Sequence, residues 1–161
     1  MTIFREDIFG CPVGLSAEGD LTAWNSMMLA FLAHAAVTPD HLGKVIESDA
    51  DFALPLICKG LFSLLLGKRE LASVALQAEK DARAAIQRRP VSNRESAYLE
   101  ALSDWNRGAP SKAGTRLNDF LCTMPEDALA MKLVQAIRFV MGDAVGMRTS
   151  IEHTIARIGL D

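Results

Sequence analysis

Three histidines are the first residues to examine for metal or acid–base chemistry. His34 and His41 lie seven residues apart across an expected turn, and His153 follows Glu152 in an expected helix. Zinc sites place His and Cys ligands in closely spaced pairs, and many metalloproteases carry HExxH, but the sequence has neither pattern. We therefore expect exposed or core histidines and predict no metal site.

The three cysteines are equally poor candidates, because Cys11, Cys58 and Cys122 are odd in number and widely spaced. Such spacing gives neither a disulfide framework nor a metal-binding pair. Cys58 and Cys122 lie among apolar residues, which predicts small buried side chains. The sequence also lacks a GxSxG motif and a Cys/His nucleophile pair. It therefore predicts no catalytic residue, no cofactor and no enzymatic activity.

The composition limits the class of protein and of partner. With 161 residues, half of them apolar, the chain is expected to form one domain with a substantial core. A net charge of -3 argues against nucleic acid as the main partner, since phosphate binding needs a basic field. The basic cluster of Arg83, Arg88 and Arg89 is expected to be a solvated helix end.

The N-terminus does not resemble a signal peptide, and the apolar run 52–66 is too short to span a bilayer. We predict a cytoplasmic location and no membrane partner.

Apolar residues recur at three- and four-residue steps along most of the chain, as in amphipathic helices. Prolines, glycines and polar caps divide this pattern into eight helices. They are expected at about 21–37, 39–48, 52–66, 68–88, 92–107, 110–124, 126–141 and 144–158. No stretch shows sustained two-residue alternation, so no sheet is expected.

Several residues are typical of helix starts. Asp20 is the expected N-cap of the first helix. Ser92 and Glu95 have the spacing of a capping box, in which each side chain accepts a bond from a free backbone N–H. Pro39 and Pro110 are expected in the first turns of their helices.

The turns between paired helices indicate an internal repeat. Gly67, Gly108 and Gly142 are 41 and 34 residues apart, and the second separation equals one tetratricopeptide repeat (TPR). Small residues at matching offsets predict close helix approach at Gly60, Ala101, Ala72 and Ala113. The prediction is an all-α fold, an α-α superhelix of about four TPR-like hairpins over residues 20–161, capped by an arm of residues 1–19. The alternative is a generic helical bundle whose turns contain glycine.

A set of short segments, in a particular order, adds a family resemblance. They are residues 7–13 (DIFGCPV), 49–54 (DADFAL), Arg94-Glu95, 125–130 (PEDALA), Phe139, Gly142-Asp143 and Met147-Arg148. In these segments the chain resembles the N-terminal part of the tetratricopeptide repeat protein 38-like proteins. The resemblance implies a repeat scaffold without enzymatic activity. Ala50 stands where such repeats often have proline, and the family's C-terminal repeats are absent. We therefore expect either part of a longer protein or a short relative.

The repeat register predicts a concave binding face on the first helix of each hairpin. That face is apolar with one cation, and its expected binding residues are Trp24, Leu61, Tyr98, Leu102, Trp105, Lys132 and Phe139. An apolar face of this size is expected to be covered by the N-terminal arm, by a second copy of the chain or by further repeats. It could equally bind an amphipathic helix or an apolar peptide.

Two functions follow from this interpretation. The first is a non-catalytic scaffold for protein–protein interaction or self-association, with a protein, a peptide or its own second copy as partner, and a homodimer as one expected form. The second is an enzyme or small-molecule binder with a pocket under the N-terminal arm, near His34 or His41. Neither function involves nucleic acid.

Overall fold

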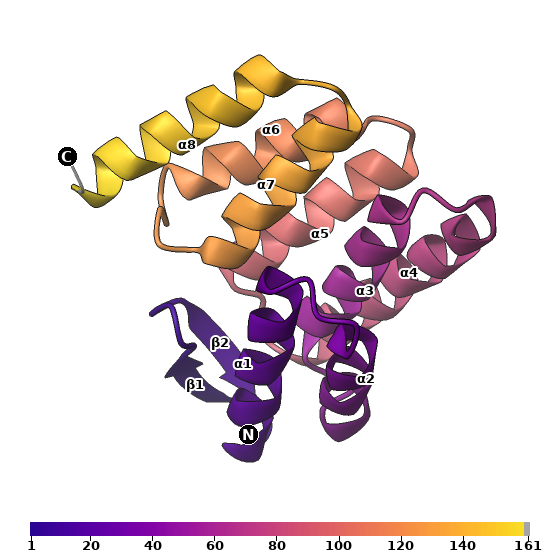
Figure 1. Cartoon of the computed structure of the whole chain (residues 1–161). Helices are drawn as coiled ribbons and strands as arrows, with labels where there is room; N and C mark the ends of the chain where they lie inside the picture. Colours follow the sequence, from indigo (N-terminus) through magenta and orange to yellow (C-terminus); the bar gives the residue numbers. More distant parts are fainter. Residues whose placement is uncertain (160–161) are drawn as a thin grey trace.

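Eight α-helices follow one another between Gly19 and Ile158 in the computed structural model, which describes residues 1–159 (Figure 1). They are α1 (Gly19–Leu32), α2 (Thr38–Ser48), α3 (Ala53–Leu65), α4 (Ala72–Arg88), α5 (Asn93–Asn106), α6 (Pro110–Leu121), α7 (Ala128–Val140) and α8 (Ala144–Ile158). A short 3-10 helix, η1 (Arg69–Leu71), leads into α4. The predicted all-α class is confirmed, and each expected helix is present, although the first ends at Leu32 rather than Val37.

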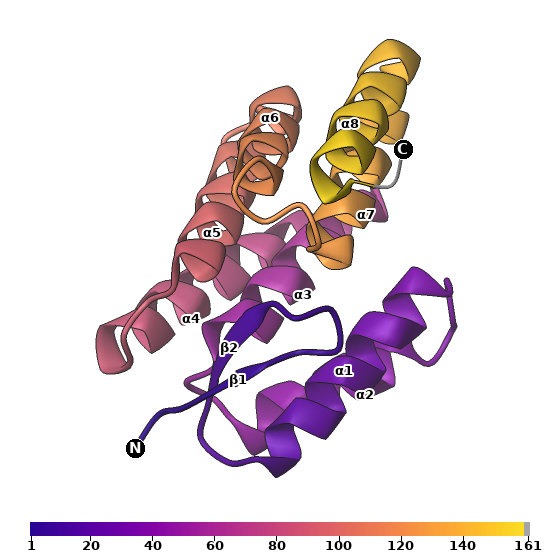
Figure 2. The ribbon, with the colours of Figure 1, turned by 90° about the vertical axis from the view of Figure 1, so that its left-hand side faces the viewer.

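The helices pair in chain order as hairpins, α1 with α2, α3 with α4, α5 with α6 and α7 with α8 (Figure 1). Successive hairpins pack through α2 and α3, α4 and α5, and α6 and α7, and α3 also packs on α5. Helix α1 approaches α7, so the first and last hairpins meet (Figure 2). This packing is consistent with a superhelix.

A residue in the left-handed conformation follows the first helix of each hairpin. Gly67, Gly108 and Gly142 have φ angles of 65°, 83° and 71°, which glycine adopts without steric cost. The corresponding residue of the first hairpin is His34, with a φ of 54°. The predicted turn glycines are therefore confirmed, and the first turn has the same geometry without a glycine.

Helix starts follow the local signals with one exception. The predicted capping box is present, because Glu95 N–H donates to Ser92 Oγ at 3.1 Å and Ser92 N–H donates to Glu95 Oε2 at 2.9 Å. Both prolines predicted in first turns lie there. Asp20 is not the N-cap of α1, since the helix begins one residue earlier. It is buried in the first turn and accepts a hydrogen bond from Ala17 N–H at 3.0 Å.

Small residues allow α3, α4 and α5 to approach closely. A Cβ on Gly60 would lie 2.7 Å from the Leu102 side chain, so this position requires glycine unless Leu102 moves. Ala101 and Ala113 are buried as expected, but Ala72 is exposed, so its predicted role in helix contact is wrong. Four other alanines of α4 are buried instead. They are Ala75, Ala78, Ala82 and Ala85.

The expectation of no sheet is wrong, because the N-terminal arm forms a two-stranded antiparallel hairpin of β1 (Ile3–Glu6) and β2 (Pro12–Leu15). Strand β1 is mostly exposed and β2 buries three residues in a row, so neither strand alternates. Val13 and Leu15 belong to the same core as the helices. The arm is thus part of the packed molecule. No helix within residues 1–159 has both the length and the apolarity to cross a bilayer.

His34→Gly is expected to stabilise the protein by about 1 kcal/mol, because a non-glycine residue at positive φ is strained. For a chain of this size the melting temperature should rise by about 2–4 °C, measured by circular dichroism. Gly108→Ala, at a φ of 83°, is the opposite control and should lower it. A lower melting temperature for His34→Gly would contradict this account of the turn.

Candidate functional site

The main cluster of buried charges is centred on Arg94, at the start of α5. Its Nη1 donates to Asp7 Oδ2 at 2.7 Å, its Nε donates to Asp127 Oδ2 at 2.7 Å, and its Nη2 donates to Asp127 Oδ1 at 3.1 Å. The side chains of all three are at most 1% exposed. The Tyr98 hydroxyl lies 3.1 Å from both Asp127 oxygens, and Trp24 Nε1 donates to Asp7 at 3.4 Å. This Arg94 centre joins the arm, α1, α5 and α7.

The carboxylates of the Arg94 centre are also bound by the backbone. Asp7 Oδ1 accepts from Phe9 N–H at 3.0 Å and Cys11 N–H at 3.1 Å, which shapes the loop between β1 and β2. Asp127 Oδ1 accepts from Ala130 N–H at 3.0 Å and caps α7. Every carboxylate oxygen of the centre therefore has a partner within the chain. Such an arrangement holds segments together and offers no free group for catalysis.

Burial and charge fix the protonation state of this centre. Burial, and next the charge of Asp127, raise the pKa of Tyr98 well above its ordinary value, so the hydroxyl stays protonated and donates. Burial acts to lower the pKa of Arg94, but neighbouring Tyr98, Asp127 and Asp7 outweigh it and raise that pKa well above the ordinary value. The guanidinium is therefore charged in the folded protein at neutral pH.

A second buried ion pair joins Arg89, just after α4, to Asp49, just after α2. Two bonds of 2.8 and 3.0 Å connect them, and their side chains are 8% and 2% exposed. Arg89 also donates to Gly14 O at 2.7 Å and to Ser16 Oγ at 2.6 Å, which fixes the arm beside β2. The prediction of a solvated basic end is therefore wrong for Arg89.

The buried cysteines Cys11 and Cys58 are poor nucleophiles in this environment. Burial raises the pKa of Cys11 to about 12, and burial also strongly raises the pKa of Cys58. Cys58 is buried as predicted, but Cys122 is exposed at the end of α6, so that prediction is wrong. Among residues 1–159, no group of three or more His, Cys, Asp and Glu side chains is placed to hold a metal ion.

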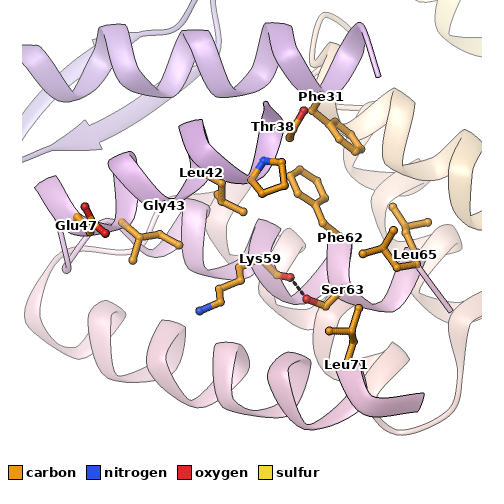
Figure 3. A pocket seen from close by; sticks show the side chains of 13 residues that line it. Phe31, Thr38, Leu42, Gly43, Glu47, Lys59, Phe62, Ser63, Leu65 and Leu71 are labelled. Carbon is orange, nitrogen blue, oxygen red and sulfur yellow. Dashed lines mark hydrogen bonds between the residues drawn. The ribbon is translucent and has the colours of Figure 1, made fainter. Parts of the chain in front are cut away.

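An apolar hollow of about 560 Å³ lies between α1, α2, α3 and η1 (Figure 3). Thr38, Glu47, Lys59 and Ser63 are its polar or charged lining residues. The ring of Phe31 stacks on Phe62 at its wall, with centroids 4.1 Å apart. Its apolar side chains are Phe31, Pro39, Leu42, Ile46, Phe62, Leu65, Leu66 and Leu71.

A second hollow, of about 870 Å³, lies between the end of α1, the end of α3, α7 and the start of α8. Its lining residues are Phe31, Leu32, His34, Leu65, Ala128, Met131, Lys132, Gln135, Ala136, Phe139, Val140 and Met147. Both hollows share Phe31 and Leu65, so we describe them together as the Phe31 groove. Neither hollow is lined by a residue of the arm.

Lys132 is the cation in the wall of the second hollow. Its Nζ donates to Phe31 O at 2.9 Å and to Leu32 O at 2.8 Å, the last carbonyls of α1. A cation at the negative end of a helix is favourable, and this contact ties α1 to α7. Burial lowers the pKa of Lys132 from its ordinary value of 10.5.

The structure divides the predicted concave face into two groups. Trp24, Leu61, Tyr98 and Leu102 are 0% exposed, so the chain itself covers them and they are not an open binding surface. Trp105 packs against the core and is partly buried. The remaining two predicted residues do line the groove. They are Lys132 and Phe139, and Phe139 is 74% exposed.

The sequence interpretation missed the Arg94 and Arg89 centres. A signal was present, because the segments that carry the family resemblance contain Asp7, Asp49, Arg94 and Asp127. Their pairing could not be inferred from the sequence, because the partners lie far apart in the chain. The Arg94–Asp7 pair spans 87 residues.

Comparisons of the chain with protein-family models, with curated proteins and with solved structures found no match. The resemblance to the tetratricopeptide repeat protein 38-like proteins therefore stays a prediction.

Arg94→Met is expected to cost about 3–5 kcal/mol, because it leaves two carboxylates buried without their cation. Urea unfolding followed by circular dichroism measures this change. The matched control is Arg148→Met, which removes an exposed ion pair with Glu152 and should change little. Equal stability of the two variants would contradict a structural role for the Arg94 centre.

Asp49→Asn should reduce the acid sensitivity of the protein. Burial acts to raise the pKa of Asp49, but bonds from Arg89 and Ser16 outweigh it and hold that pKa below its ordinary value of 3.8. A carboxyl with a depressed pKa contributes stability above its unfolded pKa and loses it as pH falls through the folded pKa. The advantage of the native protein over the variant should be full near pH 6 and shrink below about pH 4. Urea unfolding at several pH values would test this, and a constant difference would contradict it.

Proposed function

We propose that this chain is a non-catalytic, TPR-like interaction scaffold of the cytoplasm whose Phe31 groove binds an apolar helical segment of another protein. The observation that carries the proposal is that two apolar hollows lie next to each other and share Phe31 and Leu65 as lining residues. Exposed Leu66, Phe139 and Val140 extend the apolar surface at the groove's edges. Apolar grooves of this kind accept helices through residues spaced by three and four.

The length of the groove supports a helix as its occupant. Its residues on α7 extend from Ala128 to Val140, which corresponds to about 18 Å along that helix. A partner helix of about three turns would match this span. Phe139 has the exposure and position of an anchoring contact, since aromatic residues dominate the energy of many interfaces.

The polar groups of the groove indicate what the partner carries. Lys132 contributes a cation whose two bonds, to Phe31 O and Leu32 O, go to neutral carbonyls. A helix with an apolar face and flanking acidic groups would complement this charge.

The support for a small-molecule site under the arm is weaker. Both hollows lie away from the arm, and His34 lines the second one at the end of α1. The buried side of the arm is occupied by the Arg94 and Arg89 centres, whose charges are already paired.

Phe139→Ser should weaken helix binding by about tenfold or more, since burying a phenylalanine contributes about 1.5–3 kcal/mol. The probe is a panel of fluorescein-labelled amphipathic peptides, with leucines at steps of three and four and glutamates on the flanks, measured by fluorescence anisotropy. Val145→Ser is the matched control, because Val145 is 78% exposed and does not line the groove. The proposal fails if no peptide binds the native chain, or if both variants bind equally.

A further inference from the structure

The two hollows of the Phe31 groove differ in the charged side chains that line them. The first hollow has one acid and one base, Glu47 and Lys59 (Figure 3). The second has two basic side chains, His34 and Lys132, and no Asp or Glu among residues 1–159 lines it. The groove is therefore balanced in charge over the first hollow and basic over the second.

The ammonium group of Lys132 is held in place with one donor to spare. It has three N–H donors, of which two bind Phe31 O and Leu32 O. Both acceptors are neutral, so no acid within residues 1–159 balances the charge of this side chain. A carboxylate of a bound ligand could accept the third bond and form the missing ion pair.

His34 is the second basic group of this hollow, exposed just after α1. Histidine is the side chain that changes charge between about pH 5 and 8. Of the elements around it, α7 contributes Lys132, whereas α3 and α8 contribute only uncharged residues to the hollow. The acids that precede α7 and α8 are already paired, Asp127 with Arg94 and Asp143 with Arg138. Protonation of His34 therefore adds positive charge that nothing lining the hollow offsets.

We propose that the acidic end of the bound helix lies over the second hollow, against Lys132 and His34, and that protonation of His34 strengthens binding. The inference rests on the proposed function, because it assigns a direction and a pH dependence to a ligand of the same groove. Over the first hollow, an acidic end would meet Glu47 as well as Lys59 and would gain little. Charge complementarity therefore favours one direction of the helix.

The pH dependence is tested with a fluorescein-labelled amphipathic peptide that carries two glutamates in one terminal turn, by fluorescence anisotropy at pH 6.0 and 8.0. The native chain should bind it about two- to fivefold more tightly at pH 6.0. The peptide glutamates are ionised at both values, since their ordinary pKa is about 4.3. A peptide with glutamines in their place should bind equally at both pH values, and one with lysines should bind more weakly at pH 6.0.

His34→Asn should bind the acidic peptide equally at both pH values, because asparagine also adopts positive φ but carries no charge. The matched control is His153→Asn, since His153 is exposed and lines neither hollow, and it should keep the native pH dependence. Equal affinity of the native chain at both pH values, or a pH dependence that survives in His34→Asn, would overturn the inference and leave the proposed function standing. Absence of peptide binding at both pH values would overturn both.

A crosslink tests the direction of the helix. In a Cys122→Ser background, one variant carries Ala136→Cys, one turn after Lys132 in the second hollow, and the other carries Gly43→Cys in the first. A Cβ at Gly43 meets nothing within 4 Å, so the side chain fits. A peptide with a cysteine at its acidic end should form the disulfide faster with Ala136→Cys, and one with a cysteine at the other end faster with Gly43→Cys. Equal rates or the reverse preference would overturn the assigned direction.

Discussion

The structure depends most on the burial of the Arg94 guanidinium between Asp7 and Asp127. A buried charge is costly unless it is paired and hydrogen-bonded, and here the two carboxylates come from the arm and from the N-cap of α7. The ion pairs therefore tie the arm, α5 and the start of α7 together. The backbone bonds to Asp7 and Asp127 extend that constraint to the β-hairpin loop and to the first turn of α7.

The same constraint decides which apolar surface is open. By holding the arm in place, the Arg94 centre closes the chain over Trp24 and Tyr98, which are fully buried. The Arg89–Asp49 pair fixes the arm at a second point, beside β2. Apolar surface remains open elsewhere, in the Phe31 groove and along α8. The chain itself thus covers one apolar face and leaves the other accessible to solvent.

Local physics made much of the fold predictable from the sequence. A capping box, a proline in a first turn and a glycine after a helix act within a few residues, so Ser92, Pro110 and Gly108 could be interpreted directly. The positive φ of His34 could not be predicted, because a histidine, unlike a glycine, gives no specific signal for that conformation. The Arg94 centre and the β-hairpin depend on contacts between distant residues, which local patterns do not indicate. The spacing of apolar residues also does not tell a face covered by the chain from a face open to solvent. Tyr98 was therefore predicted on an open face, whereas it is fully buried.

The four hairpins also differ in how their second helices are covered, and this difference decides which apolar residues stay exposed. Helices α4 and α6 each contact the hairpin that follows, and most of their apolar residues belong to the core, although Leu76 of α4 is 49% exposed. Helix α8 has the same apolar spacing as α6 but a neighbour on one side only within the described chain. On this helix Ile151, Ile155 and Ile158 are 40%, 41% and 44% exposed, so Ile151 and Ile155, whose counterparts in α6 belong to the core, stay accessible to solvent in α8 within the described residues.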